Sequence, residues 1–190
     1  HVLVVNDRLP ARDLKALLAL LRAQPGRLNY GSAGNGSTFH IAAELFKSVA
    51  DVQVAHVPYR GGGPALTDTI GGQVDMCFPV LSAARSYIEG GKVRALGVTG
   101  AARSALLPQV PTLAQAGLPG YRFETWFIAF APAGTPAAVI ERLNDALNRT
   151  LGAPAVRERM TSQGFEPLPS TPAQARARLE TEMPKWAALV

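Results

Sequence analysis

The sequence of 190 residues contains a single cysteine, Cys77, which excludes an internal disulfide and a zinc site built from several cysteines. No apolar run is long and uninterrupted enough to span a bilayer. The motifs of several enzyme classes are also missing: there is no Gly-x-Ser-x-Gly elbow, no Walker-type phosphate loop and no Gly-x-Gly-x-x-Gly fingerprint. The chain therefore has few of the parts that chemical turnover requires, and it is not predicted to be an enzyme. Because Cys77 lies in an apolar run, we expect it to be a buried small hydrophobe.

Positive charge exceeds negative charge only modestly. Nineteen Lys and Arg residues against fourteen Asp and Glu residues give a formal net charge of +5. The basic residues are scattered and no run of them alternates with aromatic residues, so the sequence does not predict a nucleic-acid surface. A solvated, mildly basic surface is the better interpretation.

Histidine, the remaining candidate metal ligand, is scarce. His40 and Glu44 occupy one predicted helix at a spacing at which both side chains can reach one ion, but two ligands from one helix do not make a site. We interpret His40 as a polar contact near the start of this helix and His56 as a residue at the end of a strand. The sequence predicts no metal and no cofactor.

Strands alternate with helices through the first two thirds of the sequence, and glycines mark the helix ends. This pattern favours parallel βαβ units, which carry their ligands at the carboxyl ends of the strands. The last third is predicted to be helical. The expected strands are 2–5, 28–32, 52–57, 74–80, 93–98 and 126–131, and the expected helices are 10–24, 38–49, 65–70, 82–89, 112–116, 136–151, 154–163 and 172–186.

The stretch from Leu28 to Phe46 is the feature around which the chain is organised. A short strand leads through Gly34-Asn35-Gly36, which allows positive φ angles, into a helix that Ser37 or Thr38 is suited to cap. Such a junction presents free N–H groups and the positive end of a helix dipole, so it forms an anion seat without a cationic side chain. The alternative is an ordinary tight strand-to-helix connection, which geometry alone does not distinguish from the seat.

Four sequence segments resemble one protein family. They are LNYGSAGNGSTFHIAAELFK, VAHVPYRGGGPALTDTIGGQVDMCF, KVRALGVTGAARSALLPQVPTLAQAGLPGY and WFIAFAPAGTP. In this order, and over nearly the whole chain, they resemble the Bug family, the TctC-like substrate-binding proteins of tripartite tricarboxylate transporters. The resemblance implies a periplasmic solute-binding protein with the two-lobed α/β fold of type II periplasmic binding proteins, which closes like a Venus flytrap. It implies a small carboxylate ligand that is held largely by backbone N–H groups and hydroxyls.

The resemblance places the ligand contacts on three loops. The central loop follows the strand at Leu28, the second is the Pro-Tyr-[Lys/Arg]-Gly loop, and the third contains Phe78-Pro79. Many relatives carry a polar residue after this Phe, so Pro79 implies a different or less polar ligand. His40 matches a histidine found in many relatives, for which a structural role is implied. The expected ligand-binding residues are Ser32, Ala33, Gly34, Asn35, Gly36, Ser37, Thr38, Tyr59, Gly61, Gly62, Gly63, Pro64, Ala65, Phe78 and Pro79.

The resemblance also implies a domain organisation. A full family member has about one more half-lobe before Val2, and the start of this chain within a strand, without methionine or signal peptide, fits a piece of a longer protein. Residues 1–126 are then a complete second lobe with a parallel sheet, and residues 127–190 are the C-terminal part of the first lobe, a crossover strand and helices. The implied partners are the carboxylate, transporter subunits and, because the first lobe is incomplete, a second copy in a dimer or domain-swapped assembly.

Two other functions stay open at this point. The effector domains of LysR-type regulators share the two-lobed architecture, so a ligand-sensing module is the alternative to transport, although the sequence shows no DNA-reading helix-turn-helix. An enzyme that holds a phosphate ester in the same anion seat is a third hypothesis.

Overall fold

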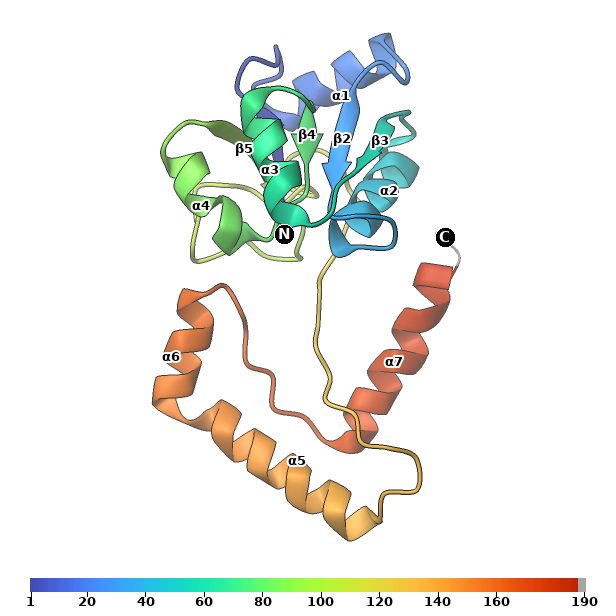
Figure 1. Cartoon of the computed structure of the whole chain (residues 1–190), viewed down its shortest axis with the longest axis vertical. Helices are drawn as coiled ribbons and strands as arrows, with labels where there is room; N and C mark the ends of the chain where they lie inside the picture. Colours follow the sequence, from blue (N-terminus) through green and yellow to red (C-terminus); the bar gives the residue numbers. More distant parts are fainter. Residues whose placement is uncertain (188–190) are drawn as a thin grey trace. The chain divides into compact units, whose positions relative to one another are not determined.

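The computed structural model describes residues 1–187, and the chain divides into two compact units between Thr125 and Trp126. The first unit contains all five strands and helices α1–α4, and the second contains α5–α7 (Figure 1). No helix within residues 1–187 is both long and apolar enough to cross a membrane. The assignment of residues 1–126 and 127–190 to two lobes of a larger protein stays a prediction.

The five strands form one mixed sheet. They are β1 Val2–Asn6, β2 Asn29–Ser32, β3 Ala55–Pro58, β4 Met76–Cys77 and β5 Val93–Val98, in the order β3-β2-β4-β1-β5. The α/β fold class is confirmed. The expectation of a wholly parallel sheet is wrong, because β2 runs parallel to β3 and β4 whereas β1 is antiparallel to β4 and β5. All five residues of β1 are buried, and its continuous apolar run Val2 to Val5 does not by itself encode the direction of the neighbouring strands.

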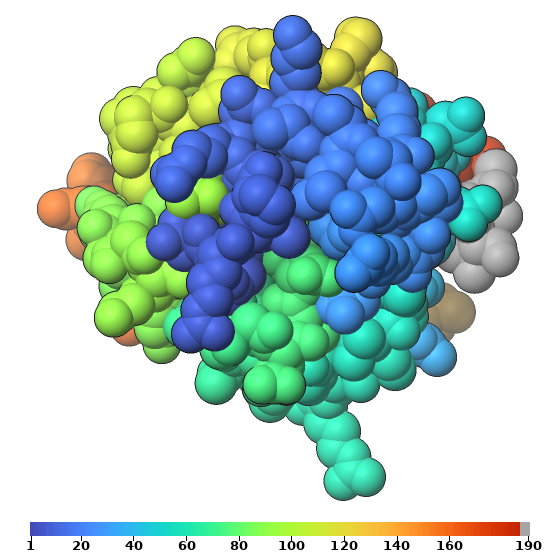
Figure 2. All heavy atoms as spheres, turned by 90° about the horizontal axis from the view of Figure 1, so that it is seen from above, coloured from blue at the N-terminus to red at the C-terminus, as the bar shows by residue number. Residues whose placement is uncertain are grey.

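Helices cover both faces of this sheet. They are α1 Leu14–Ala23, α2 Thr38–Ala50, α3 Gly62–Gly71 and α4 Leu81–Glu89. Tyr30 of β2 reaches Glu44 of α2, whereas a Cβ added to the next residue, Gly31, would lie 3.4 Å from Ala65 of α3. Because successive strand residues point to opposite faces, α2 and α3 lie on opposite sides of the sheet. Figure 2 looks onto the end of this unit where α1 and its flanking turns (blue) lie.

One hydrophobic cluster fills the space between the sheet and the side that α3 and α4 cover. It joins Val2, Val4 and Cys77 of the strands to Leu66 of α3 and Leu81 of α4. Cys77 is fully buried, as expected, and burial raises the pKa of its thiol to about 12, so the thiol stays protonated.

Two expected elements are absent from the described residues. Residues 112–116 form a single turn instead of a helix, because Thr112 is drawn into a bridge with Val98 at the end of β5. The apolar run 126–131, expected as a crossover strand, belongs to no strand. A strand requires a neighbour that pairs with its backbone groups, and within residues 1–187 no such neighbour is present.

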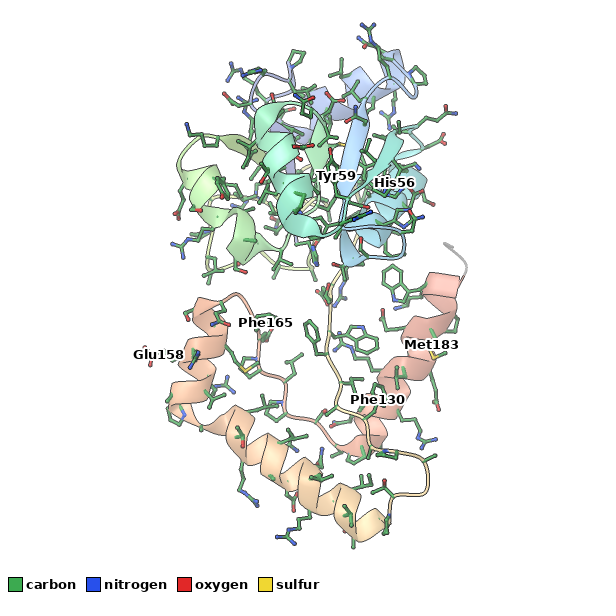
Figure 3. All side chains as sticks on the ribbon, viewed as in Figure 1. His56, Tyr59, Phe130, Glu158, Phe165 and Met183 are labelled. Atoms are coloured by element: carbon green, nitrogen blue, oxygen red, sulfur yellow. The ribbon has the colours of Figure 1, made fainter. Side chains whose placement is uncertain are left out.

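The second unit consists of α5 Ala137–Gly152, α6 Pro154–Ser162 and α7 Pro172–Ala187. Asn144 and Asn148 of α5 both donate to the carbonyl of Ser170, at 2.8 and 3.0 Å, and thereby fix the segment before α7 on α5. The rings of Phe127 and Phe165 lie 6.0 Å apart. Figure 3 labels Phe130, Phe165 and Met183 among the side chains of this unit, and all three are exposed.

Candidate functional site

The three loops predicted to bind a ligand all begin at the same edge of the sheet. β3, β2 and β4 are adjacent and parallel, with Ser32 opposite Pro58 and Gly31 opposite Cys77. Their carboxyl ends are followed directly by residues 33–38, 59–65 and 78–79. The structure therefore brings the three predicted segments together at the edge where α/β sheets carry their ligands.

The central loop, Ser32 to Thr38, is folded tightly and then opens into α2. Gly34 and Gly36 adopt φ angles of +111° and +72°, which favour glycine. The buried Ser32 hydroxyl accepts a hydrogen bond from the N–H of Gly34 at 3.1 Å. Of the two predicted caps, Ser37 and Thr38, Ser37 is the N-cap of α2, and its hydroxyl accepts from the N–H of His40 at 3.3 Å.

Several backbone donors of this loop stay available. Within residues 1–187 the N–H groups of Asn35, Thr38 and Phe39 make no hydrogen bond. Asn35 and Gly36 are exposed, and Ala33, Ser37 and Thr38 are partly exposed. Free N–H groups at the start of a helix attract anions, so the geometry is that of an anion seat formed by the backbone.

The second loop is joined to the first by backbone and side-chain contacts. The N–H of Tyr59 donates to the carbonyl of Ser32 at 3.0 Å, and the Tyr59 hydroxyl donates to Asp68 at 2.8 Å. Partial burial and the bond to Asp68 raise the pKa of Tyr59 to about 12, so the phenol stays neutral. At the start of α3, a Cβ added to Gly62 would lie 2.6 Å from the ring of Phe39 in α2, so the two helix starts are in contact.

The remaining residues of the second loop differ in exposure. Gly61, the N-cap of α3, adopts a φ of +125° and offers no side chain for capping, so the first N–H groups of α3 receive no side-chain acceptor there. Gly63 and Pro64 are exposed, whereas Ala65 is fully buried. Arg60 is exposed beside them.

The third predicted segment is largely part of the core. Phe78 is fully buried, with its ring 5.7 Å from that of Phe46, and Pro79 is buried as well. The carbonyl of Phe78 accepts from His1 Nδ1 at 2.9 Å, and that of Pro79 accepts from the N–H of Val2 at 3.1 Å. These two buried residues support the sheet edge from within the core. A direct contact between them and a ligand stays a prediction.

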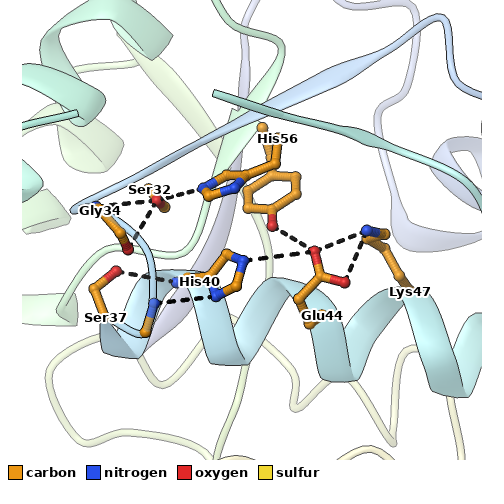
Figure 4. A network of polar contacts seen from close by, with 9 residues as sticks. Ser32, Gly34, Ser37, His40, Glu44, Lys47 and His56 are labelled. Atoms are coloured by element: carbon orange, nitrogen blue, oxygen red, sulfur yellow. Dashed lines mark hydrogen bonds and ion pairs between the residues drawn. The ribbon is translucent and has the colours of Figure 1, made fainter. Parts of the chain in front are cut away.

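A polar network beneath the central loop was not predicted from the sequence. Its centre is Glu44 of α2, which accepts from the Tyr30 hydroxyl at 2.5 Å and from Lys47 Nζ at 2.7 Å, and which lies 4.0 Å from His40 Nε2 (Figure 4). Burial alone would raise the pKa of Glu44, but the hydrogen bonds from Lys47 and Tyr30 outweigh it and lower this pKa. Glu44 is therefore an ionised carboxylate whose negative charge is paired with the positive charge of Lys47.

Two histidines connect this network to the loop. The rings of His40 and His56 lie 4.4 Å apart. His40 Nδ1 accepts from the N–H of Gly36 at 3.3 Å, and His56 Nε2 lies 2.6 Å from the Ser32 hydroxyl. Burial, and then the proximity of His40, lower the pKa of His56 and favour its neutral form. His40 is thus the polar contact near the helix start that the sequence suggested, and His56 is a further residue of the loop's support.

The sequence holds only an indirect signal for this network. Tyr30 and His56 are neighbours in the register of β2 and β3, and their rings stack 4.8 Å apart. Register depends on the pairing of distant strands and was not read from the sequence. Among residues 1–187, no group of three His, Cys, Asp or Glu side chains is placed to hold a metal ion.

Comparisons with known sequences place the chain among receptors. The family model described as "Tripartite tricarboxylate transporter family receptor" matches residues 1–190. The UPF0065 protein of the tcbD-tcbE intergenic region in Pseudomonas sp. strain P51 is 41% identical over 190 residues, which are 100% of this chain and 56% of that protein. BugT of Bordetella pertussis is 36% identical over 189 residues, 100% of this chain and 58% of BugT. The chain thus spans little more than half the length of these relatives.

Solved structures agree with the sequence matches. The structure described as R. palustris Rpa4515 with adipate has a TM-score of 0.88 and 34% identity, over 99% of this chain and 63% of that one. MatC of Rhodopseudomonas palustris with bound malate has a TM-score of 0.85 and 31% identity, over 99% of this chain and 65% of MatC. The predicted resemblance is confirmed, and the family is described as receptors, in agreement with the expectation that the chain is not an enzyme. This chain belongs to the tripartite tricarboxylate transporter receptor family, and Bug proteins are among its relatives.

Proposed function

We propose that this chain is the greater part of a periplasmic solute-binding protein that binds a small organic carboxylate and delivers it to a tripartite tricarboxylate-type membrane transporter. The observation that carries the proposal is the loop from Gly34 to Thr38, whose free backbone N–H groups lie at the carboxyl end of β2 and at the start of α2. Such a site favours a carboxylate without a salt bridge. Residues 1–126 are the complete second lobe and residues 127–190 the C-terminal part of the first.

The proposed contacts fall on the three loops at this edge. The central loop supplies N–H groups and the hydroxyls of Ser37 and Thr38, both partly exposed. The second loop supplies the start of α3 from Gly61 to Ala65 and the ring of Tyr59. The third segment supplies the apolar Phe78-Pro79 edge, which offers the ligand no side-chain hydrogen bond there.

The class of ligand follows from charge and from two relatives. Backbone N–H groups recognise a negative charge and its size, and Pro79, which is buried, offers no side-chain hydrogen bond. Relatives in this family were solved with adipate and with malate, which are both dicarboxylates. We therefore propose a dicarboxylate for this chain. The expectation of a dimer or a domain-swapped assembly has no support in these comparisons.

A thermal-shift screen tests the proposal directly. Mono-, di- and tricarboxylates, nicotinate-like aromatic acids and phosphate esters are compared with chloride at equal ionic strength. We expect a dicarboxylate to raise the Tm in a dose-dependent way, because a ligand that binds only the folded state stabilises it by mass action. Stabilisation by phosphate esters alone would contradict the proposal.

A further inference from the structure

We propose that His40 is a positioning residue whose protonation releases the Gly36 amide to a bound carboxylate, so that ligand binding and proton uptake are coupled. This inference rests on the proposed carboxylate site at the loop from Gly34 to Thr38. It concerns a residue that the ligand itself does not have to touch.

The starting point is a hydrogen bond that occupies a donor of the seat. The Gly36 N–H is directed to His40 Nδ1 at 3.3 Å, although Gly36 is exposed at the tip of the loop. An imidazole nitrogen that accepts a hydrogen bond carries no proton, so the neutral His40 ring bears its proton on Nε2, next to Glu44. In this state the Gly36 N–H is not available to a ligand, in addition to the N–H groups of Gly34 and Ser37, which bond within the loop.

Protonation of His40 reverses this arrangement. When Nδ1 takes up a proton from water, it becomes a donor and no longer accepts from Gly36. The two N–H groups then oppose each other, and the Gly36 amide requires another acceptor, which a carboxylate oxygen supplies. The imidazolium also adds a positive charge beneath the seat, and both effects favour an anion.

The His40 ring is surrounded by titratable groups from three elements. The titratable groups that face it are Tyr30 of β2, Glu44 and Lys47 of α2 and His56 of β3. Glu44 lies 4.0 Å from His40 Nε2 and stabilises the imidazolium. His56 is disfavoured as the second charge because the two rings lie only 4.4 Å apart and because its pKa is lowered by burial.

Thermodynamic linkage makes the coupling reciprocal. If protonation of His40 strengthens carboxylate binding, then the carboxylate must favour protonation of His40 by the same factor. The test therefore covers the pH range in which an ordinary imidazole changes its charge.

The first experiment measures malate and adipate affinity by calorimetry on this chain between about pH 8 and about pH 6. We expect the Kd to fall roughly threefold or more as the pH falls, with net proton uptake in buffers of different ionisation enthalpy. His40→Gln can still accept from Gly36 but does not titrate, so its affinity should follow only the titration of the ligand. His56 is the neighbouring ring but makes no bond to Gly36, so the affinity of His56→Gln should keep its dependence on pH. An unchanged slope in His40→Gln would overturn the proposal.

A second measurement separates this inference from the proposed function. In the ligand-free protein, the amide resonance of Gly36 should titrate together with the His40 ring and become pH-independent in His40→Gln. A Gly36 amide that does not respond to His40 would overturn the inference and leave carboxylate binding untouched. If malate and adipate bind at no pH, the proposed function fails, and the amide titration by itself supports or overturns the role of His40.

Discussion

At the scale of single residues, Gly36 and Gly71 differ in whether their backbone conformation requires glycine. Gly36 has open space around its Cβ position, but its φ of +72° lies in the region that L side chains avoid. Gly71, at the end of α3, also has open space but no positive φ. Backbone strain and steric room can therefore be separated by placing the same side chain at these two positions.

Replacement of Gly36 by valine should abolish carboxylate binding. A left-handed conformation costs an L residue roughly 1–2 kcal/mol, and a β-branched one more, so the loop is expected to leave its anion-binding form. Gly71→Val should keep the affinity, and Arg60→Ala should weaken binding less than Gly36→Val, since backbone donors dominate. Calorimetry with malate measures all three. If Arg60→Ala alone eliminates binding, the ligand is gripped by a salt bridge and the backbone seat is wrong.

Among the elements, α1 and α2 begin in the same way but at different places. Asp13 caps α1 by accepting from Ala16 N–H at 2.7 Å, and Ser37 caps α2 by accepting from His40 N–H at 3.3 Å. Both caps satisfy a backbone donor that the helix leaves open. Only the α2 cap belongs to the candidate site, so the pair separates the contribution of capping to stability from its contribution to binding.

Removal of either cap should lower stability, but only one removal should affect the ligand. Ser37→Ala and Asp13→Ala are each expected to reduce the free energy of unfolding by about 1 kcal/mol. Ser37→Ala should also weaken malate binding several-fold, because the start of α2 becomes less ordered. Denaturant titration and calorimetry check the two quantities. Equal affinities in the two variants would show that the start of α2 does not hold the ligand.

The sequence predicts elements better than it predicts their pairing. The strand-loop-helix unit around Ser37 follows from local residue types, because glycine torsions and capping act over a few residues. The antiparallel direction of β1 and the contact between Ser32 and His56 join distant segments and leave no local pattern. The run 126–131 shows the reverse error: its apolar composition predicts a strand, but pairing requires a neighbour that the described chain does not provide.

At the scale of the whole molecule, the two units differ in how many of their apolar side chains are buried. The first unit buries residues from β1, β2, β4 and β5, with Val2 and Val4 fully inaccessible. In the second unit no residue of α5 or α6 is buried, and Leu143 and Leu147 of α5 stay 50% and 46% exposed. Apolar burial is the main source of folding stability, so the second unit is expected to have a lower free energy of unfolding for its size than the first.

Native-state hydrogen exchange should resolve this difference. We expect the amides of β1 and β5 to exchange only through global unfolding, whereas those of α5 and α6 open at a much lower free energy. The measurement is made on the monomer, whose state is checked by sedimentation. Equal protection in the helices and in the central sheet would mean that the second unit is stabilised by contacts other than its own apolar burial.

The position of β1 in the sheet has a consequence for the order of events during folding. β1 lies between β4 and β5, and both pairings join distant parts of the sequence, with Val4 opposite Cys77 and Val2 opposite Val98. β1 can complete its backbone hydrogen bonds only after both of these later strands have reached it, and contacts of such long sequence separation form slowly. Until then its apolar residues Val2 to Val5 have no partner, so this strand is the part of the sheet most exposed to aggregation while the chain folds.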